Sequence, residues 1–434
     1  MTSEDWPELR LGDLVDERGI SYGIVQPGSD CAGGVPIVRV NNLREGRVVT
    51  DDVKRVSPDI ESKYGRTRLR GGEVLVSLVG SLGQTAIAPP TLQGWNVARA
   101  VAVVPVREDI GADWVAYVLR SPTLQHRMRT RATTTVQATL NLQDVRELPI
   151  PLPDRLERDR VTSALRALDD KIELNRRMNR TLESIARAIF KSWFVDFDPV
   201  RKTMEGGEAG PPLALSALFP CSFEGSELGE IPKGWEMGTL ADVTTLNPES
   251  RTKATRSTLI NYVDLSNTKW GRIESVTTYA GDDAPSRAQR VLRSGDTIVG
   301  TVRPGNGSYA LVSDDGLTGS TGFAVLRPTN TVYAQYVYLA ATAVEKIEAL
   351  SRLADGGAYP AVRPEAVAAT AIIRPSNGVL AAFSRVAGPL LGKLARNERQ
   401  SRNLATLRDA LLPKLISGEL LVSPAKRVIP EVDA

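Results

Sequence analysis

The sequence predicts an α+β protein made of two similar mixed domains, each followed by one long helix. Three observations predict this architecture. The chain of 434 residues repeats itself at an interval of about 222 residues. Short β-rich runs punctuated by glycine open each repeat, and a sustained 4-3 apolar rhythm closes it. A chain of this length also excludes a single small binding module.

The internal repeat is the most informative feature of the chain. The segment 145–153 aligns with 367–375, at an offset of 222 residues, and the same offset pairs Lys171 with Lys393 and Leu182 with Leu404. Upstream, 69–76 aligns with 292–299. This interval is far longer than a solenoid repeat, so the duplicated unit is a whole domain with its helix.

Each repeat opens with a domain of strands followed by a helical stretch. We expect strands at 35–40, 73–77 and 100–105 in the first repeat and at 259–263, 296–300 and 322–326 in the second. A helical stretch follows in each, at 113–131 and 331–352. Pro153 and Pro375 then precede the long helices, a position where proline is tolerated.

The long helices carry a coiled-coil seam with polar residues at its middle. The residues expected to pair the two helices are Ile172, Asn175, Asn179, Leu182, Leu394, Asn397, Ser401 and Leu404. Polar residues inside a seam fix its register. Antiparallel pairing sets Asn179 opposite Asn397 and parallel pairing sets Asn175 there, so periodicity leaves the orientation open. The alternative is two independent amphipathic helices, each packed on its own domain.

The boundaries of the predicted parts follow from the repeat and its punctuation. The first domain covers 1–153, the first long helix 154–198, a linker 199–232, the second domain 233–375, the second long helix 376–421 and a tail 422–434.

Composition narrows the class of protein. The 54 Lys and Arg residues exceed the 51 Asp and Glu residues by only 3, so nucleic acid is permitted as a partner but must be bound by local patches. Two cysteines cannot form a disulfide framework and fit a reducing compartment. No signal segment or run of 18 apolar residues is present, which indicates a soluble cytoplasmic protein.

Catalytic motifs are incomplete throughout the chain. The single histidine, His126, excludes histidine-rich metal sites. The loop 300–305 has phosphate-loop glycine spacing but lacks the lysine and hydroxyl residue that must follow. The segment 247–250 begins like the Asn-Pro-Pro-aromatic motif of amino-methyltransferases and lacks the aromatic ring. We therefore predict no catalytic residues and no metal site in this chain.

Glycine-looped basic segments in both repeats are suited to DNA, because Arg reads guanine and Asn or Gln reads adenine. In an extended strand, Arg66, Arg68 and Arg70 would share one face. The alternative is that such charged runs are ordinary solvated surface. The candidate DNA-binding residues are Asn41, Asn42, Arg44, Arg66, Arg68, Ser81, Gln84 and Arg99 in the first repeat, and Arg251, Lys253, Arg256, Arg303, Asn306, Ser308, Tyr359 and Arg363 in the second.

Four motifs carry a resemblance to a known family. Lys171-Ile-Glu-Leu-Asn175 and Lys191-Ser-Trp-Phe194 are similar to the central region of specificity (S) subunits of type I restriction–modification systems. The segment 229–235 resembles the opening of that family's second recognition domain, and 411–420 resembles its closing helix. The likeness covers nearly the whole chain.

The resemblance implies two target-recognition domains separated by a pair of long antiparallel coiled-coil helices related by a pseudo-two-fold. Each domain would read one half of an asymmetric, interrupted sequence in double-stranded DNA. The helices would set the unread spacer and dock modification (methyltransferase) subunits, two per chain. Chemistry would belong to the partners: S-adenosylmethionine in the methyltransferase subunit, ATP and magnesium in the restriction subunit, and no cofactor in this chain.

Several alternatives remain open at this point. The chain could serve a methylation-only complex, or be a coiled-coil scaffold without DNA specificity, or an enzyme with an unrecognised site. Trp193, Phe194 and Phe197 either pack the first domain on its helix or face a modification subunit. Arg408 on the seam makes the partner face of the second helix less certain than that of the first.

Overall fold

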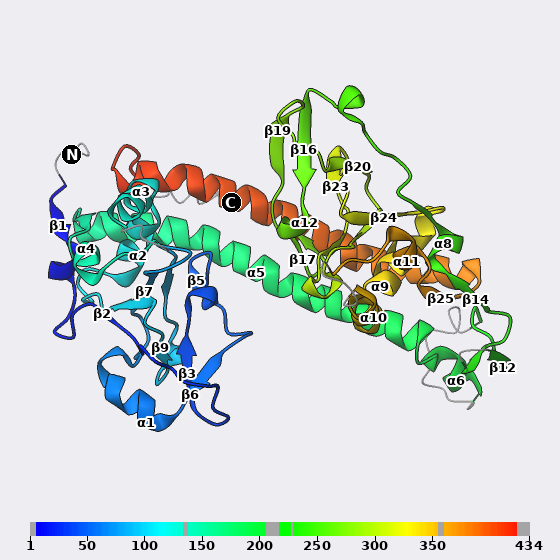
Figure 1. Cartoon of the computed structure of the whole chain (residues 1–434), viewed down its shortest axis with the longest axis horizontal. Helices are drawn as coiled ribbons and strands as arrows, with labels where there is room; N and C mark the ends of the chain where they lie inside the picture. The colour runs from blue at the N-terminus through cyan, green and yellow to red at the C-terminus, as the bar shows by residue number, and fades with distance from the viewer. Residues whose placement is uncertain (1–5, 133–137, 205–216, 227–228, 355–359, 423–434) are drawn as a thin grey trace, which may run out of the picture. The chain divides into compact units, whose positions relative to one another are not determined.

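The computed structural model describes residues 6–132, 138–204, 217–226, 229–354 and 360–422 (Figure 1). The chain divides into two compact units. Unit 1 comprises residues 1–173 and 400–434, and unit 2 comprises residues 174–399. Each unit therefore contains one repeat and a part of each long helix.

Unit 1 is built on short strands. These are β1 (Glu8–Arg10), β2 (Ser21–Tyr22), β3 (Val35–Val38), β4 (Leu43–Arg44), β5 (Arg47–Val48), β6 (Lys54–Val56), β7 (Val74–Ser77), β8 (Thr85–Ile87), β9 (Asn96–Val97), β10 (Val101–Val104) and β11 (Pro149–Pro151). The sheets have the orders β2-β10-β7-β8, β6-β3-β9, β4-β5 and β1-β11. The pair β3–β9 is parallel, whereas the pairs of the β2-β10-β7-β8 sheet are antiparallel.

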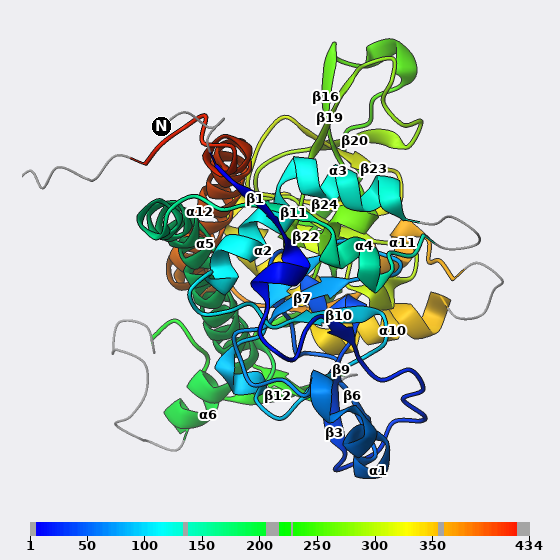
Figure 2. The ribbon, with the colours of Figure 1, turned by 90° about the vertical axis from the view of Figure 1, so that its left-hand side faces the viewer.

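The helices of unit 1 flank these sheets. They are α1 (Pro58–Glu61), α2 (Ala112–Arg120), α3 (Pro122–Arg131), α4 (Leu142–Arg146) and the start of α5 (Arg155–Phe194). Figure 2 shows α2 beside the sheet that holds β7 and β10, and α1 beside β3 and β6. The stretch predicted as one helix over 113–131 is two helices, because Ser121 caps α3 through its Oγ and Pro122 opens it.

Unit 2 repeats this plan with longer strands. They are β12 (Phe223–Ser226), β13 (Gly229–Pro232), β14 (Glu236–Thr239), β15 (Thr244–Leu246), β16 (Leu259–Val263), β17 (Thr268–Lys269), β18 (Arg272–Ile273), β19 (Thr277–Ala280), β20 (Ala288–Leu292), β21 (Thr297–Gly300), β22 (Tyr309–Leu311), β23 (Leu317–Ser320), β24 (Phe323–Pro328) and β25 (Ala371–Arg374). Its helices are α6 (Asp198–Met204), α8 (Leu240–Val243), α9 (Ala334–Ala341), α10 (Val344–Ala354), α11 (Pro364–Ala368) and α12 (Asn377–Ile416), the last of which ends in unit 1.

The strand orders show that the sequence repeat is a structural repeat. The sheet β15-β24-β21-β22 matches β2-β10-β7-β8, and β14-β25 matches β1-β11. The parallel pair β16–β23 corresponds to β3–β9, and β17-β18 corresponds to β4-β5. Even single contacts recur: Trp114 donates its indole N–H to the carbonyl of Pro151, and Tyr336, 222 residues later, donates its hydroxyl to the carbonyl of Ile373.

The central strands are hydrophobic without alternation because both of their faces are buried. In β7, Val74 and Val76 point into a core that includes α2 and the ends of the long helices, whereas Leu75 points into a second core. In β21, Val299 and Ile298 divide between two cores in the same way. A strand covered on both faces is expected to read as a continuous apolar run.

The two long helices are each 40 residues long. Asp154 caps α5 by accepting a hydrogen bond from the Glu157 amide, and Ser376 does the same for α12 through the Val379 amide. Helix α12 reaches a mean hydropathy of 1.2 over 18 residues, enough by composition for a membrane span. In this fold, however, Phe383, Ala387 and Leu391 pack in the core of unit 2.

The ends of the long helices pack on the repeat to which they do not belong in sequence. Phe190, Trp193 and Phe194, near the end of α5, lie in the core of unit 2 with Tyr336 and Phe383. The residues 222 positions later, Leu412, Leu415 and Ile416, lie in the core of unit 1. The expectation that Trp193, Phe194 and Phe197 pack the first domain is therefore wrong, because α5 crosses into unit 2 before these residues are reached.

Candidate nucleic-acid interface

The loop between β21 and β22 brings several candidate residues of unit 2 together. Val302 pairs antiparallel with Ala361, and the Arg303 amide donates to the carbonyl of Pro360 at 2.9 Å. The side chains of Arg303, Asn306 and Arg363 are all exposed. This arrangement therefore offers two guanidinium groups and one carboxamide to solvent from adjacent segments. Tyr359 lies outside the described residues.

Ser308 ends the same loop but faces inward. Its side chain is buried, and its hydroxyl donates to the carbonyl of Leu265 at 3.0 Å. A hydroxyl used in this way holds the loop to its neighbour, so the structure gives Ser308 a supporting position instead of a surface one.

A second group of unit 2 candidates lies at the outer sheet β19-β16-β23-β20. Lys253 is exposed, and Arg251 is half-buried with its guanidinium donating to the Ser257 hydroxyl at 2.6 Å. Arg256 donates to the carbonyls of Ala284 at 2.9 Å and Pro285 at 2.7 Å. Arg256 thus braces the segment before β20, whereas Lys253 is available at the surface.

In unit 1, the candidate residues at and before β4 differ in exposure: some lie on the surface and one is buried. Asn41 and Arg44 are exposed. Asn42 is only 3% exposed, and its carboxamide donates to the carbonyls of Val49 and Asp52, both at 2.9 Å. Since Asn42 also accepts from the backbone of this turn, its side chain shapes the loop.

Arg66 does not lie in an extended strand, which is the condition under which Arg66, Arg68 and Arg70 would share one face. Residues Ser62–Thr67 form a 3-10 helix instead, and Arg66 donates to the carbonyl of Arg18 at 2.6 Å. Arg68 holds the Glu61 carboxylate with two hydrogen bonds, of 2.8 and 2.6 Å. That hydrogen bonding keeps the pKa of Glu61 below its ordinary value against the effect of burial. Both arginines remain exposed at their outer surface.

The remaining unit 1 candidates lie on turns. Ser81 and Gln84 are exposed in the loop between β7 and β8, which corresponds to the loop between β21 and β22 in unit 2. Val79 pairs antiparallel with Thr139, as Val302 does with Ala361. Arg99 is exposed next to β9, with its amide bonded to the carbonyl of Ile24.

The polar layer of the long helices is in direct contact. Within unit 2, Asn397 donates to the Asn179 Oδ1 at 2.8 Å, and Asn175 donates to the Asn397 carbonyl at 3.3 Å. Asn179 in turn donates to the carbonyl of Leu394, one turn earlier. The pairing of Asn179 with Asn397 is the one expected for antiparallel helices. Of the other seam residues, Leu182 also lies in unit 2, and Ile172, Ser401 and Leu404 lie in unit 1.

Arg408, which departs from the apolar seam, is satisfied within unit 1. It is 13% exposed and donates to the Asp169 carboxylate at 2.6 Å. The same carboxylate accepts the Tyr117 hydroxyl at 2.9 Å and Arg120 at 3.1 Å. Asp169 therefore joins α5, α12 and α2, which gives Arg408 a role in helix pairing.

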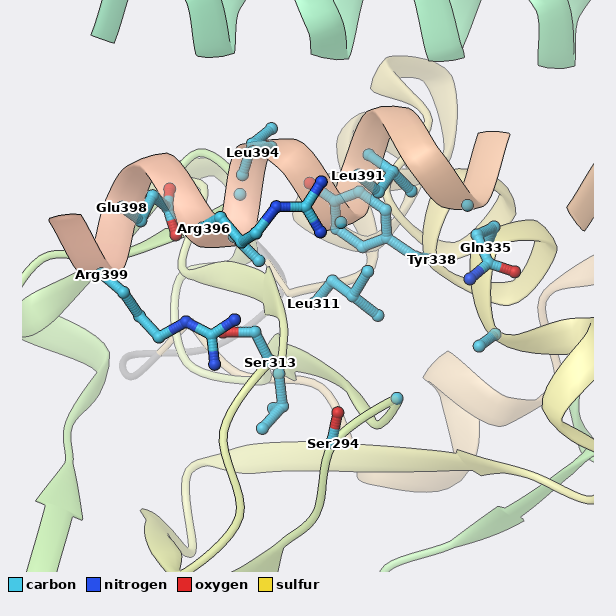
Figure 3. A pocket seen from close by; sticks show the side chains of 17 residues that line it. Ser294, Leu311, Ser313, Gln335, Tyr338, Leu391, Leu394, Arg396, Glu398 and Arg399 are labelled. Atoms are coloured by element: carbon cyan, nitrogen blue, oxygen red, sulfur yellow. The ribbon is translucent and has the colours of Figure 1, made fainter. Parts of the chain in front are cut away.

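A crevice of about 270 Å³ lies between α12 and the domain of unit 2. Figure 3 shows Arg396, Glu398 and Arg399 on its helix side, opposite Ser294, Leu311 and Ser313. Its lining includes Gly388 and Gly392. At the corresponding place in unit 1, Arg166 and Asp113 form an ion pair where unit 2 has Gly388 and Gln335, and both residues line a crevice of about 350 Å³.

Comparison with known proteins shows similarity to DNA specificity domains and specificity subunits of type I restriction enzymes. Residues 3–184 match the type I restriction modification DNA specificity domain. The chain is 30% identical over 198 residues to the type I restriction enzyme EcoBI specificity subunit of Escherichia coli, covering 43% of this chain and 42% of that one. It is 23% identical to the HindI specificity subunit of Haemophilus influenzae, covering 96% of this chain and 100% of that one.

Two further similarities extend over the whole chain. The MjaIX specificity subunit of Methanocaldococcus jannaschii is 24% identical over 96% of this chain and 94% of its own length. The crystal structure of the S subunit from M. genitalium shares the fold with a TM-score of 0.51 and 15% identity, covering 95% of this chain and 96% of that chain. Residues 3–184 thus match a type I restriction modification DNA specificity domain, and the chain is similar over nearly its whole length to specificity subunits of type I restriction enzymes.

Proposed function

We propose that this chain is the DNA sequence-recognition subunit of a type I restriction–modification complex. Each unit reads one half of an asymmetric, two-part target in double-stranded DNA. Two methyltransferase subunits and a restriction subunit are the partners, and the complex works in the cytoplasm. The chain itself performs no catalysis.

One observation carries this proposal. The same loop, between β7 and β8 in unit 1 and between β21 and β22 in unit 2, stands on the same strand order and is held by the same antiparallel bridge. The exposed side chains differ: Ser81 and Gln84 in one, Arg303 and Asn306 in the other. A repeated framework with different exposed groups suits the reading of two different half-sites, because base edges are distinguished by donor and acceptor patterns.

The long helices supply the second part of the proposal. A coiled-coil pair with a fixed register sets the spacing of two half-sites along the duplex, as fixed half-site spacing does in other bipartite readers. The hydrogen bonds among Asn175, Asn179 and Asn397 are the register device within unit 2. The outer faces of the helices dock the methyltransferase subunits.

The partners supply the chemistry and its cofactors. The methyltransferase subunit binds S-adenosylmethionine, and the restriction subunit binds ATP and magnesium. Among the described residues, no group of three or more His, Cys, Asp and Glu side chains is placed to hold a metal ion. This chain contributes sequence contacts, together with phosphate contacts that make DNA affinity depend on salt.

The experiment is to purify the chain with its methyltransferase subunit and to map the bases that the complex methylates in a random DNA library. We expect one interrupted motif with two specified parts. The pair R303A and N306A relaxes one part, and the pair S81A and Q84A relaxes the other. A complex that methylates without a two-part motif, or variants that relax the same part, would contradict the proposal.

A further inference from the structure

The loop between β21 and β22, residues 301–308, is called the reading loop of unit 2, and its backbone conformation is one that its sequence does not favour. Arg303 has a φ of 47° and Gly307 a φ of 68°, so left-handed residues flank the short 3-10 turn Pro304–Asn306. Glycine adopts this conformation readily, whereas arginine does not. Because non-glycine residues persist there only when their surroundings fix them, something must hold this turn.

Trp270 lies against the end of that turn. If Gly307 carried a Cβ, the Trp270 ring atoms Cδ2, Cε3 and Cε2 would lie 2.5, 2.6 and 2.7 Å from it, so the ring covers Gly307 directly. The Trp270 amide also donates to the Gly307 carbonyl at 2.6 Å. The ring meets Tyr309 edge-on at a centroid distance of 6.1 Å. Even so, Trp270 is 58% exposed, which is unusual for a tryptophan engaged on one face.

The backbone of Trp270 is itself in an unfavourable conformation. Trp270 and Gly271 form the two-residue turn between β17 and β18, with φ values of 46° and 85°. Such turns favour Asn-Gly or Asp-Gly, because both central residues are left-handed. A bulky aromatic at the first position is an outlier that calls for a reason. Its contact with the reading loop supplies that reason.

Unit 1 differs from unit 2 both in its hairpin turn and in its reading loop, the loop between β7 and β8. Its turn between β4 and β5 carries Glu45 and Gly46, with φ values of 50° and 83°. Its reading loop uses glycine, Gly80 and Gly83, at φ values of 76° and 82°. Where the loop residue is glycine the turn carries no aromatic ring, and where it is Arg303 the turn carries Trp270. The first turn residue is non-glycine in both units, but only unit 2 combines an aromatic turn residue with a non-glycine left-handed residue in the loop that the aromatic ring contacts.

We propose that Trp270 is a positioning residue for DNA recognition by unit 2. Its ring and amide fix the 303–307 turn, so that Arg303 and Asn306 meet the base edges of one half-site. The proposal rests on the proposed function of the chain. The expected ligand is duplex DNA, with Arg303 suited to guanine and Asn306 to adenine. The sequence signal for Trp270 is a Trp-Gly pair in a two-residue hairpin turn, which is neither a basic nor an amide residue pattern.

The test is a double-mutant cycle on the complete complex of this chain with its methyltransferase subunit. Binding is measured to the duplex carrying the wild-type motif and to duplexes with one base changed in either half-site. We expect W270A to reduce discrimination in the half-site of unit 2 by about 5- to 150-fold, the range for loss of one good bidentate contact, and to leave the other half-site unchanged. W270F, which keeps a ring over Gly307, should retain most of the discrimination.

Three controls keep the result specific. E45A at the corresponding turn of unit 1 should leave the half-site of unit 2 unchanged. G307A, which places a methyl group against the ring at positive φ, should reproduce the W270A defect if W270A alone fails to fold. In the R303A and N306A background, W270A should add no further loss, because a positioning residue acts through those side chains.

Two results would overturn the inference. One is that W270A leaves discrimination in both half-sites intact, and the other is that its effect is additive with R303A and N306A. If the wild-type complex itself recognises no two-part motif, the proposed function fails instead, and that outcome is visible before any variant is made.

Discussion

Asp169 allows a quantitative test of how the long helices are held within unit 1. Its carboxylate accepts hydrogen bonds from Arg408 at 2.6 Å, Tyr117 at 2.9 Å and Arg120 at 3.1 Å. The side chain of Asp169 is 25% exposed, and that of Arg408 is 13% exposed. The three donors come from α2 and α12, whereas Asp169 belongs to α5. Removal of this carboxylate therefore loosens all three helices at one point.

The expected cost of D169A follows from these contacts. A hydrogen bond to a charged group is worth about 1.5–3 kcal/mol, and the loss leaves two arginines facing each other with a buried phenol. Water reaches part of the site, so the total is well below the sum of three such bonds. We expect the free energy of unfolding to fall by about 2–3 kcal/mol, which corresponds to a decrease in Tm of roughly 5–10 °C. D169N should lose most of the same amount because it removes the charge.

The matched control is Asp409, the other carboxylate that contacts Arg408. Its ion pair with Arg408 measures 2.7 Å, but its side chain is 64% exposed. Exposed pairs contribute about 0–1 kcal/mol. Urea unfolding followed by circular dichroism, with hydrogen exchange over 400–416 and 377–399, separates the two variants. Equal effects of D169A and D409A, or a loss below about 0.5 kcal/mol for D169A, would refute the reasoning.

Three other predictions concern acid stability, register and spacing. Hydrogen bonds from two arginines lower the pKa of Glu249 from 4.5 to about 2; its stabilisation is therefore complete above 4.5 and lost as the pH falls toward 2, and E249Q should flatten acid unfolding in that window. N397L should cost about 1–3 kcal/mol because it leaves the Asn179 Oδ1 without its hydrogen-bond donor in a buried layer, whereas the double variant with N179L should recover part of that loss in urea unfolding. One heptad added to both long helices lengthens the pair by about 10 Å and should widen the tolerated spacer by about 3 base pairs at 3.4 Å each. A methylation map should show both half-sites unchanged around the wider spacer. An unchanged spacer would contradict the proposal that the helices set it.

The sequence predicts those features that depend on local pattern or on the repeat. The apolar runs at 73–77 and 100–105 predict strands, and the structure confirms them as β7 and β10. The seam asparagines identify the polar layer, in which both Asn175 and Asn179 contact Asn397 within unit 2. The strands and the polar layer follow from hydrophobic period and residue spacing, which can be read from the sequence without the tertiary fold.

The candidate site could be predicted only as a set of loops. Exposed Asn41 and buried Asn42 are the same residue type at adjacent positions, and only tertiary contacts decide which one braces the loop. The charge of Arg256 makes it a candidate on sequence grounds, but its guanidinium donates to the backbone carbonyl of Ala284. Likewise, the heptad pattern predicts that Trp193 is buried but does not indicate which domain it packs against. A pattern within one helix cannot report a contact made after the chain has crossed into another unit.

On the proposed function, two copies of one fold in this chain direct methylation to one two-part DNA sequence. The most direct measurement is a genome-wide map of modified bases in the source cell, with this gene intact and with it deleted. We expect one interrupted motif to lose its methylation on deletion, while other modified motifs remain. An unchanged map in cells that express the chain together with its methyltransferase subunit would contradict the claim.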